Sequence, residues 1–293
     1  MPVKKAPSLL IALFSLALWG QEASEIYLFD LAENDGIITL SNPVNISDRQ
    51  GYDNQPCFSE DGNSIFFSSE RDGQYDIAKY DLKEGYRIWI TDTEANEFSP
   101  APYPGKKKNF TCVRFEKDGT QRLFKYYYKN RPPEVLIPKL QVGYYLWFQP
   151  RIVVSFVIGD VETLQVSNFR YRIKYPICSN IGRSINKIPV AMAPGKELVS
   201  IIDLNHEEPE IYAIDPHTSE TMYLADALEG SQDLAWTLQG TMLMGKQDAI
   251  YKLHPKTDKQ WSKVRIESDL PVAGITRMAL SPNGKKIAVV VSE

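Results

Sequence analysis

The stretches FSEDGNSIFFS, residues 58–68, and SPNGKKIAVVV, residues 281–291, decide the fold of this chain. Each places a tight turn, with Asp-Gly or Asn-Gly at its centre, between two segments suited to β-strands. These dipeptides are the strongest short-range hairpin signal, because a type I′ turn needs positive φ at both central residues. The two stretches therefore predict two copies of one strand–turn–strand unit.

The apolar residue that precedes the turn recurs along the whole chain. These anchor residues are Phe58, Tyr103, Trp147, Met192, Trp236 and Leu280, separated by 45, 44, 45, 44 and 44 residues. The turn pairs after them are Asp61-Gly62, Pro104-Gly105, Gln149-Pro150, Pro194-Gly195, Gln239-Gly240 and Asn283-Gly284. A period of this length is typical of a propeller blade with four strands.

Two further strands are predicted in each copy. We expect third strands at residues 77–81, 123–124, 164–166, 211–215 and 250–253, with the same pattern at 26–30. We expect fourth strands at residues 88–91, 134–136, 173–177, 222–224, 264–267 and 37–40.

The two ends of the chain complete each other. The last copy stops after two strands, and the N-terminal segment supplies a third and a fourth strand without partners. The 13 residues after Leu280 and the 34 residues from Glu25 to Phe58 together make 47, close to one period. We therefore predict an all-β fold over residues 25–293. It is one domain, a six-bladed β-propeller of four-stranded antiparallel blades, whose sixth blade is closed by N- and C-terminal strands and leaves no open ring edge.

Residues 1–21 have the pattern of a secretory signal peptide. Lys4 and Lys5 precede the apolar run LLIALFSLAL at residues 9–18, and the chain turns polar at Glu22. This run is too short to span a bilayer. We expect cleavage near Gly20 or Gln21 and export to the periplasm or the outside, with an uncleaved N-terminal anchor as the alternative. After cleavage we expect no transmembrane segment.

Charge and cysteine content exclude several classes. The net charge of −4 does not provide the basic face that nucleic acid requires. Cys57, Cys112 and Cys178 are an odd number without a C-x-x-C motif. This excludes a disulfide-dense scaffold and a cysteine zinc site. We expect buried thiols, with a Cys57–Cys112 bridge as the alternative.

The copies resemble the S-P-D-G-K class of WD-type repeats found in TolB-like propellers. The resemblance is carried by PCFSEDG at residues 56–62 and ALSPNGK at residues 279–285, and residues 54–81 form nearly a complete repeat. More broadly, residues 25–293 are similar to small secreted bacterial propellers of this type. The resemblance implies the fold, and it implies no specific activity because that group has none assigned.

In such a propeller, the loops that lead into the inner strands open on one face, where partners usually dock. We predict a protein or peptide partner there and a monomeric chain. The candidate binding residues are Tyr52, Asp53, Asn54, Gln55, Glu97, Tyr144, Tyr145, Arg183, Ser184, Asp233 and Arg277. Arg183 and Arg277 are the strongest candidates, because arginine binds carboxylates in a bidentate manner. The alternative is that each pairs with Asp53, Glu97 or Asp233 and locks blades together.

Catalytic patterns are missing from the sequence. There is no G-x-S-x-G motif, and three dispersed histidines do not indicate a triad or a metal centre. We therefore predict no cofactor and a non-catalytic, secreted or periplasmic TolB-like scaffold that binds a protein or peptide in the cell envelope. The alternative is a metal-dependent hydrolase or lactonase. Its Ca²⁺ ligands at the channel would be Asn54, Asn186, Glu97 and Asp233. A third interpretation is a purely structural envelope component.

Overall fold

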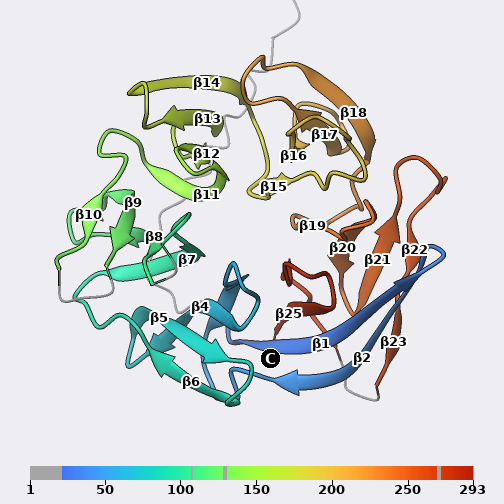
Figure 1. The fold of residues 1–293 in the computed structure, drawn as a ribbon, viewed down its shortest axis with the longest axis horizontal. Coiled ribbons are helices and arrows are strands. Elements are labelled where there is room, and N and C mark those ends of the chain that lie inside the picture. The colour runs from blue at the N-terminus through green and yellow to red at the C-terminus, as the bar shows by residue number, and fades with distance from the viewer. Residues whose placement is uncertain (1–21, 107, 128–130, 269–271, 293) are drawn as a thin grey trace, which may run out of the picture.

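The computed structural model describes residues 22–106, 108–127, 131–268 and 272–292. In these residues every regular element is a β-strand, and the strands form six small sheets arranged in a ring (Figure 1). The predicted six-bladed propeller is therefore confirmed. The predicted signal peptide, residues 1–21, lies outside the described residues. Within those residues, no helix is long and apolar enough to cross a membrane.

In every blade one strand lines the channel, and the others follow it in order toward the outer edge. Blade 1 contains β3 (Asp53–Phe58), β4 (Ser64–Arg71), β5 (Gln74–Asp81) and β6 (Tyr86–Trp89), and blade 2 contains β7 (Asn96–Pro102), β8 (Phe110–Phe115), β9 (Gln121–Tyr126) and β10 (Glu134–Val135). Blade 3 contains β11 (Val142–Gln149), β12 (Ile152–Val157), β13 (Thr163–Asn168) and β14 (Ile173–Ser179), and blade 4 contains β15 (Asn186–Lys187), β16 (Val199–Asp203), β17 (Glu210–Ile214) and β18 (Thr221–Asp226). Blade 5 contains β19 (Leu234–Trp236), β20 (Met242–Lys246), β21 (Ala249–Leu253) and β22 (Ser262–Lys263), and blade 6 contains β24 (Arg277–Leu280), β25 (Lys286–Ser292), β1 (Ser24–Asn34), β2 (Ile37–Asn45) and β23 (Arg265–Glu267).

The ring is closed in blade 6, as predicted. Strand β1 pairs with β25 in antiparallel register from Ser24–Ser292 to Asp30–Lys286. The sequence placed residues 264–267 as the fourth strand of blade 5, and this is only partly right. Val264 stays with blade 5, but β23 crosses to blade 6 and pairs in parallel with β2. The crossing lets Val264 and Ile266 both pack into the apolar core between blades 5 and 6.

The turns differ from the expected type I′ geometry. Gly62 and Gly284 have φ of +71° and +67°, whereas Asp61 and Asn283 are not among the residues with positive φ. The Ser59 carbonyl accepts from the Gly62 amide at 2.9 Å, and the Ser59 amide donates to Ser64. The loops are thus longer than two residues, and only glycine adopts the left-handed conformation that it tolerates best.

The core lies between the blades. Among the described residues, buried apolar side chains form six clusters, one at each blade-to-blade interface. Two anchor tryptophans add hydrogen bonds between neighbouring blades. Trp147 donates to Thr111 at 3.0 Å, and Trp236 donates to Ser200 at 2.9 Å. Each tryptophan reaches the second strand of the preceding blade. The anchor position of the repeat therefore marks contacts between neighbouring blades as well as a strand within its own blade.

The three cysteines are free thiols, so the alternative Cys57–Cys112 bridge is not formed. Cys112 is fully buried, and Cys57 is half-buried in the wall of the central channel. Burial raises the pKa of the Cys57 thiol to about 12, which makes it a poor nucleophile.

Candidate functional site

The central channel is a cavity of about 660 Å³ lined by the inner strands. Seven of the predicted binding residues line it: Gln55, Tyr144, Tyr145, Arg183, Ser184, Asp233 and Arg277. Four of these lie together: Tyr144 in β11, Arg183 before β15, Asp233 before β19, and Arg277 at the start of β24. They come from blades 3, 4, 5 and 6. We call these four residues the Arg–Tyr cluster.

Two contacts of the cluster cross the channel. The Arg277 guanidinium donates a 2.9 Å hydrogen bond to the Tyr144 hydroxyl, and its Cζ lies 5.0 Å from the centroid of the Tyr144 ring. Arg183 donates a 3.2 Å hydrogen bond to the carbonyl oxygen of Thr276. Blades 3 and 6 lie on opposite sides of the ring (Figure 1). The cluster thus spans the channel instead of lining one wall.

A β-bulge aims Tyr144 into the channel. The register between β11 and β12 shifts between Val142 and Tyr144, with Gly143 as the extra residue. A Cβ atom on Gly143 would lie 2.9 Å from the Phe156 ring, and that ring packs edge-on against Tyr144 at 5.8 Å between centroids. Glycine at this position therefore permits the close approach that fixes the tyrosine ring.

Tethered backbone positions Arg183. The preceding residues hold the loop onto β16: Ile181 is buried and bridges to Asp203, and the Gly182 amide donates to the Ile202 carbonyl at 2.8 Å. The Arg183 side chain projects toward blade 6, where it reaches the Thr276 carbonyl.

Asp233 is held by the neighbouring blade. Its Oδ2 accepts a 2.9 Å hydrogen bond from the Met278 amide, the residue after Arg277. No carboxylate of the described residues makes an ion pair with Arg183 or Arg277 within 4 Å. The two guanidinium groups therefore remain without a direct counterion.

The charges of the cluster shift one another's pKa. Burial opposes ionisation of Tyr144, but the positive charges of Arg277 and Arg183 outweigh it and lower the pKa of the phenol. Burial and the repulsion from Arg277 lower the pKa of Arg183. Burial raises the pKa of Asp233, although both arginines act against it. Burial lowers the pKa of Arg277, but the charges of Tyr144 and Asp233 outweigh it and raise that pKa. Of the two arginines, Arg183 is therefore the one whose positive charge its neighbours compensate least.

A second cavity of about 360 Å³ meets the channel at this cluster. Arg183, Asp233 and Arg277 line both cavities. The second cavity lies between blades 5 and 6, on the side of the loops that lead into the inner strands. The larger cavity reaches the opposite end of the channel, where Glu60 and Pro150 line it in the turns after β3 and β11.

Gln55 and Ser184 also line the channel, but their polar atoms join neighbouring blades. Gln55 Oε1 accepts from the Ser99 amide at 2.7 Å, and the Ser184 hydroxyl accepts from the Leu234 amide at 3.0 Å. Both residues therefore contribute to the rigidity of the site.

Three of the predicted residues are buried and do not line the channel. Asp53 is fully buried in blade 1, and its nearest ionic partner is Arg87 at 3.7 Å, so it does not pair with Arg183 or Arg277. Asn54 is buried and donates to Ser24 at 3.4 Å. Tyr52 is 6% exposed and packs edge-on against Tyr75. Burial raises the pKa of its phenol, and the charges of Arg277 and Arg183 act against this shift, so Tyr52 lies near the Arg–Tyr cluster.

Tyr145 is half-buried, and its hydroxyl faces away from the cluster. The strand alternates sides, so the Tyr145 hydroxyl donates to Thr111 of blade 2 at 2.8 Å while Tyr144 faces the cluster. Its hydrogen-bonding group is thus engaged between two blades.

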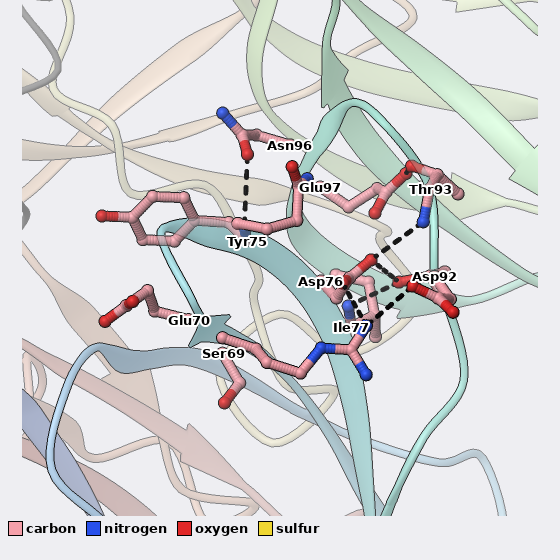
Figure 2. Close-up of polar contacts among 12 residues, drawn as sticks. Ser69, Glu70, Tyr75, Asp76, Ile77, Asp92, Thr93, Asn96 and Glu97 are labelled. Atoms are coloured by element: carbon pink, nitrogen blue, oxygen red, sulfur yellow. Dashed lines mark hydrogen bonds and ion pairs between the residues drawn. The ribbon is translucent and has the colours of Figure 1, made fainter.

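Glu97 is fully buried between blades 1 and 2, at the start of β7 (Figure 2). It accepts from the Tyr126 hydroxyl at 2.7 Å and from the Thr93 hydroxyl. The Thr93 amide in turn donates to Asp76 of β5 at 3.3 Å (Figure 2). Burial raises the pKa of Glu97 to about 7, and the nearby Asp76 adds to the shift. Glu97 therefore belongs to an inter-blade network and not to the cluster.

The ligand set considered for Ca²⁺ is not assembled. Asn54 donates to Ser24 of blade 6, and Glu97 accepts from Tyr126 within blade 2. The Asn186 amide donates to the Leu234 carbonyl at 2.7 Å. Across the described ranges, no group of three or more His, Cys, Asp or Glu side chains is arranged to hold a metal ion.

Ser99 is a channel residue that sequence reasoning missed. It lies 44 residues after Gln55, one repeat period, and both residues have positive φ beside a β-bulge. Gln55, Tyr144, Asp233 and Arg277 each lie three residues before their anchors. The position three residues before the anchor is therefore a usable signal for the channel wall, whereas Ser99 lies four residues before its anchor Tyr103.

The comparisons with known proteins concern the fold. No protein-family model matches the chain, and no curated protein sequence matches it. A protein of Agrobacterium tumefaciens assigned as TolB superposes with a TM-score of 0.68 at 12% identity, over 94% of this chain and 99% of that one. TolB from Acinetobacter baumannii has a TM-score of 0.55 at 12% identity, over 92% of this chain but 64% of that one.

An oligogalacturonate lyase in complex with manganese has a TM-score of 0.51 at 13% identity, over 94% of this chain and 98% of the lyase. Proteins named TolB and a lyase thus share this architecture, which therefore does not by itself define a function. The fold of the described residues is that of a TolB-like six-bladed β-propeller.

Proposed function

We propose that this chain is an exported, non-catalytic propeller that binds a protein or peptide partner through its central channel. The observation that carries the proposal is the Arg–Tyr cluster, in which residues from four blades meet at the junction of two cavities. A rigid ring that presents binding groups from several blades is typical of a binding scaffold. The signal-peptide pattern of residues 1–21 supports export.

The lining of the channel favours a peptide. Apolar and ring-containing side chains surround the charged cluster, among them Pro56, Pro102, Leu146 and Ile185. Such walls bury the side chains of an extended segment, while a few polar groups fix its orientation. The geometry gives no support to the hydrolase alternative, because the residues considered as Ca²⁺ ligands form hydrogen bonds in separate blades.

The test is capture of a partner by the mature chain, residues 22–293, from an envelope extract of the source organism. The Arg183→Glu/Arg277→Glu variant is compared with Arg151→Glu/Arg170→Glu, which makes the same charge change at exposed turns on the opposite face. We expect wild type and the control to retain the same partner and the channel variant to lose it. Melting temperatures exclude a loss through unfolding.

Two outcomes would contradict the proposal. If the channel variant retains the partner, the binding site lies elsewhere on the ring. If the wild type retains no partner at all, the scaffold function itself is wrong.

A further inference from the structure

We infer that Arg183 and Arg277 together bind a carboxylate group of the ligand, supplied by a peptide. This inference rests on the proposed function and names the chemistry by which the channel recognises its partner. It follows from three features of the cluster: unused donors, an excess of positive charge, and space on both sides.

Donors in the cluster outnumber the acceptors that they meet. Arg183 has five N–H groups. One of its terminal nitrogens contacts the Thr276 carbonyl, while its Nε is buried without a hydrogen-bond partner. One terminal nitrogen of Arg277 donates a hydrogen bond to the Tyr144 hydroxyl. The Thr276 hydroxyl is also buried without a partner. Buried donors of this kind cost free energy until an acceptor arrives.

The charge at the site is positive. The Lys, Arg, Asp and Glu side chains that line the channel are Arg183, Lys187, Arg277, Glu60 and Asp233, with a net charge of +1. Asp233 uses one oxygen on the Met278 amide and makes no ion pair with either arginine. An incoming carboxylate would therefore neutralise the excess and relieve the repulsion between the two guanidinium groups.

The space fits an anionic group carried by a longer ligand. The cavities of about 660 Å³ and 360 Å³ both reach Arg183 and Arg277, so a chain can continue from the carboxylate on either side. Apolar residues such as Leu146 and Ile185 line the larger cavity. A peptide with apolar side chains beside its carboxylate suits these walls better than a sugar acid, which needs polar partners for its hydroxyls.

Tyr144 reports occupancy of the site. Its pKa is lowered by the two arginines, so a carboxylate placed between them must raise it. The experiment uses the mature chain with ¹³C-labelled tyrosine, and the Tyr144 resonance is assigned with Tyr144→Phe. N-acetyl-leucine serves as the probe for a main-chain carboxylate. N-acetyl-glutamate α-amide, whose main-chain carboxyl is blocked, serves as the probe for a side-chain carboxylate. N-acetyl-leucinamide is the uncharged control, and galacturonate represents a sugar acid.

We expect a saturable shift of the Tyr144 resonance with at least one of the two peptide-like carboxylates and none with N-acetyl-leucinamide. Arg183→Gln and Arg277→Gln should each weaken that binding about tenfold, the effect of losing a charge-assisted contact. The matched control Arg151→Gln, exposed on the opposite face, should leave it unchanged. The ratio between the two carboxylate probes tells whether the ligand presents its C-terminus or an acidic side chain.

Three results would overturn the inference: no saturable shift with either carboxylate, an equal shift with N-acetyl-leucinamide, or unchanged binding in both glutamine variants. Tighter binding of galacturonate than of both peptide-like probes would replace the peptide by a sugar acid. A partner that is captured through the channel without any carboxylate response would leave the scaffold function intact and remove only this inference. Carboxylate binding without a captured partner would leave this inference intact and contradict the scaffold function.

Discussion

Arg277 and Tyr144 are 133 residues apart in the sequence, and their side chains meet across the channel in a 2.9 Å hydrogen bond between blades 6 and 3. The contact joins opposite sides of the ring, whereas the apolar cores join neighbouring blades. It also places a phenol beside two cations. The contact therefore connects two opposite walls of the channel at the Arg–Tyr cluster.

Tyr144 is expected to ionise at a lower pH than an ordinary tyrosine. Burial acts against ionisation, but Arg277 and Arg183 stabilise the phenolate and lower its pKa. Spectrophotometric titration at the phenolate absorbance band should therefore show one early-ionising tyrosine in the wild type. Tyr144→Phe should remove this step, and Arg183→Gln should move it to higher pH. An unchanged titration curve in Tyr144→Phe would contradict the expectation.

Gly143→Ala is expected to destabilise the fold. The added Cβ would lie 2.9 Å from Phe156 and 3.3 Å from Ile158, so at least one side chain must move. Overpacking of this kind costs about 1–3 kcal/mol. Urea unfolding measures the cost, and Gly159→Ala is the matched control, because the nearest atom to its added Cβ is at 3.4 Å. Equal midpoints for the two variants would show that blade 3 accommodates the methyl group.

The Glu97 carboxyl is expected to make stability fall as the pH rises. Burial raises its pKa from 4.5 to about 7, so the folded state holds a proton that the unfolded state has lost between these values. The free energy of unfolding should decrease through that window, by roughly 3 kcal/mol for the full shift, and then level off. The burial of Asp53, whose pKa rises to about 6, acts in the same direction.

Urea unfolding at a series of pH values tests this with Glu97→Gln. Glutamine keeps an oxygen that accepts from Tyr126 and cannot ionise, so the decline between pH 4.5 and 7 should become shallower. Glu94→Gln is the control, because Glu94 lies three residues earlier, before β7, and is exposed. An identical pH profile in Glu97→Gln and wild type would refute the assignment.

Phe29→Ala is expected to weaken the closure of the ring. Phe29 is fully buried in β1 and packs in the core between blades 5 and 6. Removing a buried phenylalanine costs about 3–5 kcal/mol, a large part of the stability of a typical domain. Ile37→Ala in β2 is the control, because Ile37 is 65% exposed and should change stability by less than about 0.5 kcal/mol. Chemical unfolding of both variants makes the comparison.

Much of the architecture could be predicted from the sequence, because blade formation depends on local patterns that recur. The anchors from Phe58 to Leu280 set the number of blades, and the incomplete repeats at the two ends set the closure of blade 6. The parallel strand β23 could not be predicted in the same way. Its partner β2 lies in another part of the chain, and pairing at that distance depends on how blades 5 and 6 pack.

The candidate site was predicted only in part. All eleven residues were chosen for their place in the loops that lead into the inner strands, and sequence position alone could not show which side of a strand each residue faces. The β-bulges at Gln55, Ser99 and Gly143 change that direction locally. Tyr144 faces the Arg–Tyr cluster as a result, whereas the Tyr145 hydroxyl bonds to blade 2.

The sequence by itself determined the type of fold, the blade count and the way in which the two ends meet, since these follow from hydrophobic alternation, turn residues and a constant period. Only the tertiary structure decided that Arg183, Arg277, Tyr144 and Asp233 share one site while Glu97 and Asp53 are buried elsewhere. The physical reason is that a closed ring brings residues from different blades to a common axis. Whether a side chain reaches that axis depends on bulges and inter-blade packing, which no single repeat contains.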